Sequence, residues 1–172
     1  SPRLKAELVD RLAGREVPVV DVALLSPVPG RGLRTPMLVS GDGAARYAEI
    51  LHGLGVDVTI QDGPAGAAIS RKLLRSVFYK GLAAAVIEAL DAARAAGCEE
   101  WLRGNIRTEL AGFGHDTLDR LVDGSHTHAR RRAQEMTAAS GQLSELGVQP
   151  RIATAARDLL IMLSERPEET ET

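Results

Sequence analysis

The 172-residue sequence has one cysteine, few aromatic residues and no long apolar run. The single thiol, Cys98, cannot form an internal disulfide, and no Cys/His spacing resembles a zinc site, so a reducing, cytoplasmic setting is expected. Aromatic side chains make up only 3% of the chain, so its core must be built from Ala, Leu, Val and Ile. No apolar run approaches the roughly 18 residues that span a bilayer, which argues against a membrane protein.

A strong charge of one sign is also missing. The chain has 21 basic and 23 acidic residues and a net charge of −2, which gives no general attraction to nucleic acid or to an anionic membrane. The run Arg130-Arg131-Arg132 lacks stacking aromatics, and a solvated helix start is its simplest interpretation. His126 and His128 would point to different helix faces, so no metal site is expected.

No Gly-x-Gly-x-x-Gly fingerprint for dinucleotides follows a strand anywhere in the sequence. The segment Gly30-Arg31-Gly32 is flanked by proline and cannot start the helix that the fingerprint requires. The chain also begins at Ser1-Pro2, which is typical of a helix start rather than of a complete polypeptide. We therefore expect a fragment of a longer protein that does not bind a dinucleotide well by itself.

The first 62 residues have the pattern of an α/β segment. Apolar periodicity and turn signals predict the order helix, strand, strand, helix, strand. The expected ranges are residues 1–12, 17–25, 37–39, 44–54 and 56–60, with an irregular Pro/Gly loop from Ser26 to Gly32 between the first two strands.

From residue 65 onward the strand patterns end and helical patterns with alanine-rich faces follow. Helices are expected over residues 65–96, 99–110, 115–121, 127–146 and 151–164. The first is long enough to suggest a buried spine held in its core by Leu73, Leu74, Val77 and Phe78, with Gly81 as a site of close packing or bending. The acidic end 165–172 is expected to be frayed. Two domains result, 1–62 and 63–172.

The boundary between these domains carries the most informative pattern in the chain. Gly63 and Gly66 form a turn that opens the long helix, and Lys72 follows on its second turn. A 100° step per residue places Lys72, Arg75, Ser76 and Tyr79 on one face, which is suited to binding an anion. A lysine on such a face is suited to exchange a proton with a hydroxyl or a carbonyl. Periodicity alone favours the simpler interpretation, in which both cations extend into solvent from an amphipathic helix.

The glycine and lysine spacing resembles the G-x-x-G-x-x-x-x-x-K segment of the β-hydroxyacid dehydrogenase and 6-phosphogluconate dehydrogenase superfamily. The segments 21–26 and 35–42 resemble its late strands, and 72–81 and 128–136 are most similar to a bacterial phosphogluconate dehydrogenase-like subgroup. The resemblance implies a fold in which the C-terminal end of a Rossmann-like NAD(P)-binding sheet joins a mainly helical domain, like that of 3-hydroxyisobutyrate dehydrogenases.

The same resemblance implies an NAD(P)-dependent oxidoreductase that acts on a small hydroxy acid or related carbonyl, expected to be anionic. Lys72 would be the catalytic acid or base, and the main cofactor motif would lie upstream of this chain. The substrate-binding candidates are Ser26, Arg31, Arg75 and Ser76. A homodimer formed through the helical domain is implied as well, in which His128 and Arg131 could reach a neighbour's active site.

Two departures from the family pattern keep an alternative open. The family's loop carries Ser-Gly-Gly where this chain has Ser26-Pro27, and many members have asparagine where this chain has Ser76. Both changes predict an altered substrate choice. Together with the missing fingerprint, the lost asparagine also allows a noncatalytic helical dimerisation module that retains the dehydrogenase fold.

Overall fold

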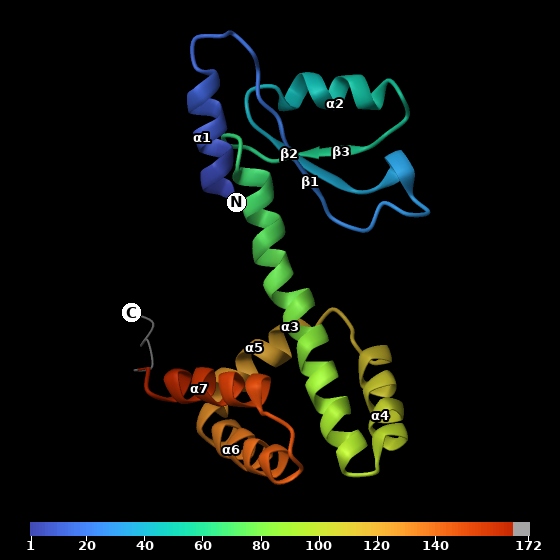
Figure 1. The fold of residues 1–172 in the computed structure, drawn as a ribbon, viewed down its shortest axis with the longest axis vertical. Helices are drawn as coiled ribbons and strands as arrows, with labels where there is room; N and C mark the ends of the chain where they lie inside the picture. Colours follow the sequence, from blue (N-terminus) through green and yellow to red (C-terminus); the bar gives the residue numbers. More distant parts are fainter. Residues whose placement is uncertain (167–172) are drawn as a thin grey trace. The chain divides into compact units, whose positions relative to one another are not determined.

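A computed structural model of the protein describes residues 1–166. The chain folds as two units, Ser1–Lys80 and a second that begins at Gly81. A small α/β unit is thus followed by an all-helical one, in the order that the sequence predicts (Figure 1). The predicted domain boundary after residue 62 stays a prediction, while the structure places the division within helix α3.

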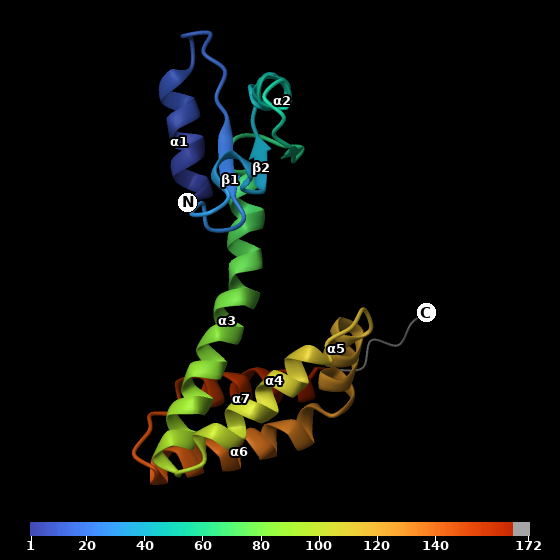
Figure 2. The ribbon, with the colours of Figure 1, turned by 90° about the vertical axis from the view of Figure 1, so that its right-hand side faces the viewer.

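The first unit contains a three-stranded sheet and its flanking helices. Its elements are α1 (Pro2–Leu12), β1 (Asp21–Leu24), a 3₁₀ turn (Gly32–Arg34), β2 (Met37–Ser40), α2 (Ala44–His52), β3 (Val58–Ile60) and the first turns of α3 (Ala67–Ala95). Strand β2 is central, antiparallel to β1 and parallel to β3. In Figure 2, α1 and α2 lie on opposite sides of this sheet.

The core of the first unit lies between the sheet and α2. It is made of buried aliphatic side chains from both layers: Met37, Val39, Ala44, Ala48, Val56 and Val58. Val39 is completely buried, and Tyr47 and Leu51 of α2 pack against the same cluster. This core fixes β1 and β2, whose ends hold the start of α3.

The second unit is a set of helices with small side chains at its contacts. It contains the rest of α3, then α4 (Glu99–Ala111), α5 (Thr117–Thr127), α6 (Ala129–Glu145) and α7 (Arg151–Ser164). Helices α6 and α7 pack side by side (Figure 2). Among the described residues, the buried apolar side chains of this unit are all alanines: Ala92, Ala93, Ala129, Ala133 and Ala153.

Several predicted boundaries are corrected by the structure. The strand expected over 17–25 is confined to Asp21–Leu24, because Pro18 has no amide hydrogen and the Val19 amide donates to the Asp42 side chain instead of to a neighbouring strand. The last strand, expected over 56–60, is shortened to Val58–Ile60, because the Val56 amide donates to the Leu51 carbonyl at the end of α2. The helix expected to end at residue 54 ends at His52, with Gly55 in the left-handed region after it.

The prediction that α3 is a buried spine is wrong for its middle part. Leu73, Leu74, Val77 and Phe78 are between 46% and 74% exposed, so they do not anchor the helix in a core. Gly81 is not a point of close packing either, since a methyl group there would meet no other atom within 4 Å. None of the helices in residues 1–166 is long and apolar enough to cross a membrane.

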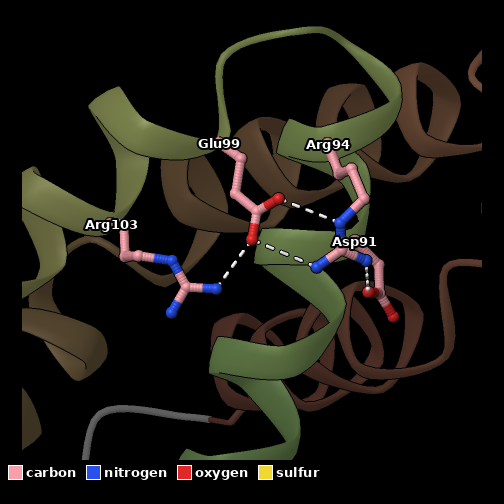
Figure 3. A network of polar contacts seen from close by, with 4 residues as sticks. All are labelled: Asp91, Arg94, Glu99 and Arg103. Atoms are coloured by element: carbon pink, nitrogen blue, oxygen red, sulfur yellow. Dashed lines mark hydrogen bonds and ion pairs between the residues drawn. The ribbon is translucent and has the colours of Figure 1, made fainter.

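The turn between α3 and α4 is fixed by an ion-pair network (Figure 3). The Arg94 guanidinium donates to the Glu99 carboxylate at 2.9 and 3.1 Å and to Asp91 at 2.9 Å, while Arg103 donates to Glu99 at 2.6 Å. The bonds from Arg94 and Arg103 lower the pKa of Glu99 to about 2. The guanidinium groups of Arg94 and Arg103 are therefore both engaged in ion pairs within the protein rather than free for a ligand.

Candidate active site

Helix α3 begins on two buried acceptors supplied by the sheet. One carboxylate oxygen of Asp21 accepts hydrogen bonds from the Gly66 and Ile69 amides at 3.0 and 2.9 Å, and the Ser40 hydroxyl accepts one from the Ala68 amide at 2.9 Å. Asp21 and Ser40 are directly opposite each other in the β1–β2 register, so their side chains share one face of the sheet. They satisfy amides that a helix start otherwise leaves unpaired.

One lysine and two glycines also contribute to the junction between the sheet and the start of α3. The other carboxylate oxygen of Asp21 lies 3.2 Å from the Lys5 ammonium of α1, and the Asp21 side chain has no exposed surface. Gly66 has φ +115°, and a Cβ there would lie 3.1 Å from the Pro2 carbonyl oxygen. Gly41, at φ +102°, faces the Val19 carbonyl too closely for any side chain. The position of α3 on the sheet is therefore tightly defined.

Lys72 lies on the second turn of this fixed helix. Its side chain is half-buried, and within residues 1–166 its ammonium makes no hydrogen bond or ion pair. Ser76, one turn later, is also half-buried and donates its hydroxyl hydrogen to the Lys72 carbonyl at 2.9 Å. The Ser76 hydroxyl is thus engaged with its own helix, which is a common arrangement for serine in a helix interior.

Arg75 is the candidate that reaches the sheet. Its Nη1 donates to the Leu25 carbonyl at 2.9 Å, at the end of β1, and its guanidinium carbon lies 4.1 Å from the centre of the Tyr79 ring. Ser26 follows Leu25 directly. Its hydroxyl oxygen is buried and has no hydrogen-bond partner in the described part of the chain. The structure therefore brings Arg75 to the segment that carries Ser26.

Arg31 stands apart from these residues. It is exposed in the loop after β1, and no hydrogen bond or ion pair of its side chain occurs among residues 1–166. The irregular loop predicted over Ser26–Gly32 is followed by a 3₁₀ turn, Gly32–Arg34, which the buried Thr35 hydroxyl closes by donating to the Gly32 carbonyl at 2.7 Å.

The histidine and arginine cluster lies at the break between α5 and α6. His128, Arg130 and Arg131 line an open hollow of about 370 Å³ together with Thr127 and Gln134. Arg131 is paired with Glu135, one turn along α6. No group of three or more potential metal ligands occurs in the part of the chain that the structure describes. The role of His128 and Arg131 in a neighbour's active site stays a prediction.

A dinucleotide would not fit the two glycine turns of the first unit. At the turn before α3, the amides of Gly66, Ala68 and Ile69 are bound by Asp21 and Ser40. At the turn before α2, the Gly41 and Gly43 amides donate to the carbonyls of residues 63 and 19 at 3.1 and 3.3 Å. A pyrophosphate needs such amides unoccupied, so neither of these two turns provides its cradle.

Sequence reasoning missed the residues that hold the candidates in place. Asp21 was part of a predicted strand and Ser40 followed another, but nothing local distinguishes a capping acceptor for a helix more than 20 residues away. A carboxylate at the head of an apolar strand was the available signal, because such a group is rarely buried without partners. The contact of Arg75 with Leu25 was equally invisible, since it involves a main-chain carbonyl.

Comparison with known proteins shows which sequences and folds this chain is similar to. Residues 93–161 match a family described as a domain of unknown function, DUF1932. An uncharacterized 28.5 kDa protein from Methanothermus fervidus is 35% identical over 101 residues, which are 58% of this chain and 39% of that protein. A solved structure, the conserved protein MTH1747 of unknown function, described as similar to 3-hydroxyacid dehydrogenases, is 25% identical with a TM-score of 0.56, over 96% of this chain and 62% of the other.

A reductive aminase from Aspergillus terreus, solved with NADPH and ethyl levulinate, has a TM-score of 0.71 over 94% of this chain and 60% of its own, at 14% identity. Likeness at that identity establishes the fold alone. The chain spans less than two thirds of each of these proteins.

The fold is therefore that of the C-terminal end of a Rossmann-like sheet joined to the helical domain of a dehydrogenase, as predicted. The resemblance to the 6-phosphogluconate dehydrogenase-like and β-hydroxyacid dehydrogenase superfamily that was drawn from the sequence is confirmed at the level of the fold.

Proposed function

We propose that this chain is the C-terminal part of an NAD(P)-dependent oxidoreductase that acts on a small hydroxy acid or related carbonyl. One observation carries the proposal: a helix fixed to the sheet by Asp21 presents a half-buried Lys72 one turn before Arg75, which touches the end of β1. The likeness of MTH1747 to 3-hydroxyacid dehydrogenases and the NADPH bound by the fungal reductive aminase support the same reaction class.

Lys72 is the proposed general acid and base. A nicotinamide, when bound, supplies or accepts the hydride at the reacting carbon. Lys72 would hold the accompanying proton at Nζ, give it to the carbonyl oxygen during reduction and take it from the hydroxyl during oxidation. Because the amides of both glycine turns are already occupied, we propose that the main NAD(P)-binding residues lie upstream of Ser1.

Four residues are proposed to contact the substrate: Ser26, Arg31, Arg75 and Ser76. Ser26 would need a rotation about its Cα–Cβ bond, since its oxygen is shielded from solvent. That rotation is favoured if it reaches an acceptor, because a buried hydroxyl without a partner costs about 1–3 kcal/mol. Ser76 would contact the substrate through its oxygen while its hydrogen remains on the Lys72 carbonyl.

The test compares two lysines on the same helix. The full-length protein, with any residues that its gene places before Ser1, is assayed for oxidation of NADH and NADPH with small oxo acids. Replacing Lys72 by alanine should lower kcat by roughly 10²–10⁴-fold, the usual contribution of a positioned acid or base. Lys80→Ala, at an exposed position two turns further, should change it little. Equal rates in both variants would refute a catalytic Lys72.

A homodimer formed through the helical domain is proposed as well. Large apolar side chains of the second unit are exposed, notably Ile87, Trp101 and Leu118 at 61%, 68% and 66%. The same surface supports the rival proposal, a helical dimerisation module without catalysis. A protein that sediments as a dimer but neither binds nor oxidises a nicotinamide cofactor would favour the rival.

A further inference from the structure

Arg75 is fixed in space although it lies on an exposed helix face. Its Nη1 is bonded to the Leu25 carbonyl at 2.9 Å, and the flat guanidinium stacks at 4.1 Å on the Tyr79 ring. The Tyr79 ring in turn meets the edge of the Phe78 ring, with centroids 5.1 Å apart and an interplanar angle of 77°. An arginine held at two points loses less freedom when it binds a ligand than one that samples many rotamers.

The charge of Arg75 is nevertheless not compensated. No carboxylate forms an ion pair with it in residues 1–166, and one of its five N–H groups is used by the bond to Leu25. Several other arginines are paired with acids, Arg94 and Arg103 with Glu99 and Arg157 with Asp158. Arg132 and Arg151 instead donate to the neutral side chains of Ser125 and Gln149. Arg75 is therefore oriented by neutral groups, a carbonyl and a ring, which leave its positive charge available.

The position of this charge relates it to the proposed chemistry. Arg75 and Lys72 are three residues apart on α3, so their Cβ atoms are neighbours at roughly 5–6 Å. A molecule whose carbonyl reaches Lys72 can place an acidic group on Arg75 only if a short carbon chain separates the two. A carboxylate matches the guanidinium with two parallel hydrogen bonds, which a neutral ester cannot reproduce.

We propose that Arg75, held by the Leu25 carbonyl and the Tyr79 ring, is the specificity-determining residue that selects a carboxylate-bearing substrate over its neutral ester. Tyr79 is the positioning residue of this clamp. The proposal rests on the function proposed above, because it assigns the carboxylate to Arg75 and the reacting carbonyl to Lys72.

The test uses pairs in which the ester lacks the negative charge and carries an added ethyl group: 2-oxobutanoate, 3-oxobutanoate and 4-oxopentanoate, each with its ethyl ester. In the full-length enzyme with NADPH or NADH, the acid of at least one pair should have a kcat/KM at least tenfold above its ester. Arg75→Met should lower kcat/KM for that acid by 10- to 100-fold and leave the ester unchanged. Arg71→Met, an exposed arginine one turn earlier, is the matched control and should preserve the preference.

Tyr79 variants separate positioning from mere folding. Tyr79→Leu should raise KM for the acid several-fold with kcat unchanged, while Tyr79→Phe, which keeps the ring face under the guanidinium, should restore the wild-type KM. Equal turnover of acids and esters by the wild-type enzyme, or an equal loss for both in Arg75→Met, would overturn the proposal.

A binding measurement keeps the proposal testable if no compound is turned over. The Tyr79 ring signals in NMR spectra should shift when an oxo acid is added and should not shift with its ester or in Arg75→Met. Such binding without turnover would contradict the proposed oxidoreductase activity, but it would support carboxylate binding by Arg75. Absence of any Arg75-dependent shift would refute carboxylate binding by Arg75.

Discussion

Helix α3 begins on Asp21 in the first unit, and helix α7 begins on Glu88 in the second. Asp21 accepts two main-chain amides with no exposed surface, whereas Glu88 is only half-buried and accepts the amides of Arg151, Ile152 and Ala153 at 2.7 to 2.8 Å. Both are carboxylates brought from a distant segment to a helix start. Because Asp21 is fully buried and Glu88 is not, we expect the start of α3 to be the more rigid of the two and the start of α7 to respond more to its surroundings.

The surrounding packing is also tighter at the start of α3 than at the start of α7. In the first unit, a core of valine, methionine and alanine side chains packs behind the strands that carry Asp21 and Ser40, and Gly41 next to them tolerates no Cβ. Around Glu88 the second unit buries alanines and exposes its large apolar residues. The candidate active site thus grows from the part of the chain whose geometry is most strongly determined.

The largest expected effect in this comparison is the loss of Asp21. Asp21→Ala leaves the Gly66 and Ile69 amides without an acceptor and the Lys5 ammonium without its partner. We expect a loss of about 3 kcal/mol or more in the free energy of unfolding of the first unit, since breaking a buried pair leaves an uncompensated charge. Urea unfolding followed by the amide NMR signals of each unit measures it.

Asp42→Ala is the matched control for Asp21. Its carboxylate accepts a single amide, that of Val19, at an exposed position, so the expected loss is about 1 kcal/mol. If both variants lost the same stability, burial of the Asp21 carboxylate would not be what makes the start of α3 rigid.

Substitutions at two glycines are expected to change stability less than the loss of Asp21. Gly41→Ala should destabilise the first unit by about 1–3 kcal/mol, because the residue combines φ +102° with a Cβ position occupied by the Val19 carbonyl. Gly81→Ala should stabilise α3 by about 0.5–1 kcal/mol, since its Cβ would enter open space inside a helix. Thermal unfolding of the two variants gives the signs; a destabilising Gly81→Ala would reveal a contact at that position.

The sequence predicted those elements whose signals are local. Helix α7 was placed at Arg151–Ser164, as observed, because Pro150 and an uninterrupted helical period mark it. The length of β1 was overestimated because apolar β-branched residues continue through Val17 and Val19, while pairing depends on partners that the sequence does not reveal. The face of α3 with Lys72 and Arg75 followed from the 100° step, but its attachment through Asp21 and Leu25 depends on tertiary contacts.

The buried spine was mispredicted for a similar reason. Apolar side chains at 73, 74, 77 and 78 are compatible with a helix, but they do not determine which surface will cover them. Those side chains are exposed within the described chain, so hydrophobicity alone did not imply burial in this unit. Buried polar groups proved more informative than exposed apolar ones, and they were the residues that sequence reasoning did not single out.

The smallest expected effect concerns Glu88 and pH. Burial by itself would raise the pKa of Glu88, but the bonds from the amides of Ile152, Ala153 and Arg151 and the charge of Arg151 outweigh it, so its pKa is lowered from the usual 4.5. A carboxyl whose pKa is lower in the folded state stabilises the fold above its unfolded pKa. This stabilisation should therefore be complete at neutral pH and should disappear as the pH falls through the folded-state pKa.

Glu88→Gln should remove that pH-dependent part and cost about 1 kcal/mol at pH 7, because a neutral amide oxygen is a weaker acceptor than a carboxylate. The free energy of unfolding of the second unit is measured between pH 7 and pH 3 for the wild type, Glu88→Gln and Glu100→Gln, an exposed glutamate on α4. The Glu88→Gln curve should approach that of the wild type as the pH falls, while Glu100→Gln follows the wild type throughout. A constant offset between wild type and Glu88→Gln would mean that the charge of Glu88 does not contribute, and that the two helix starts differ in packing alone.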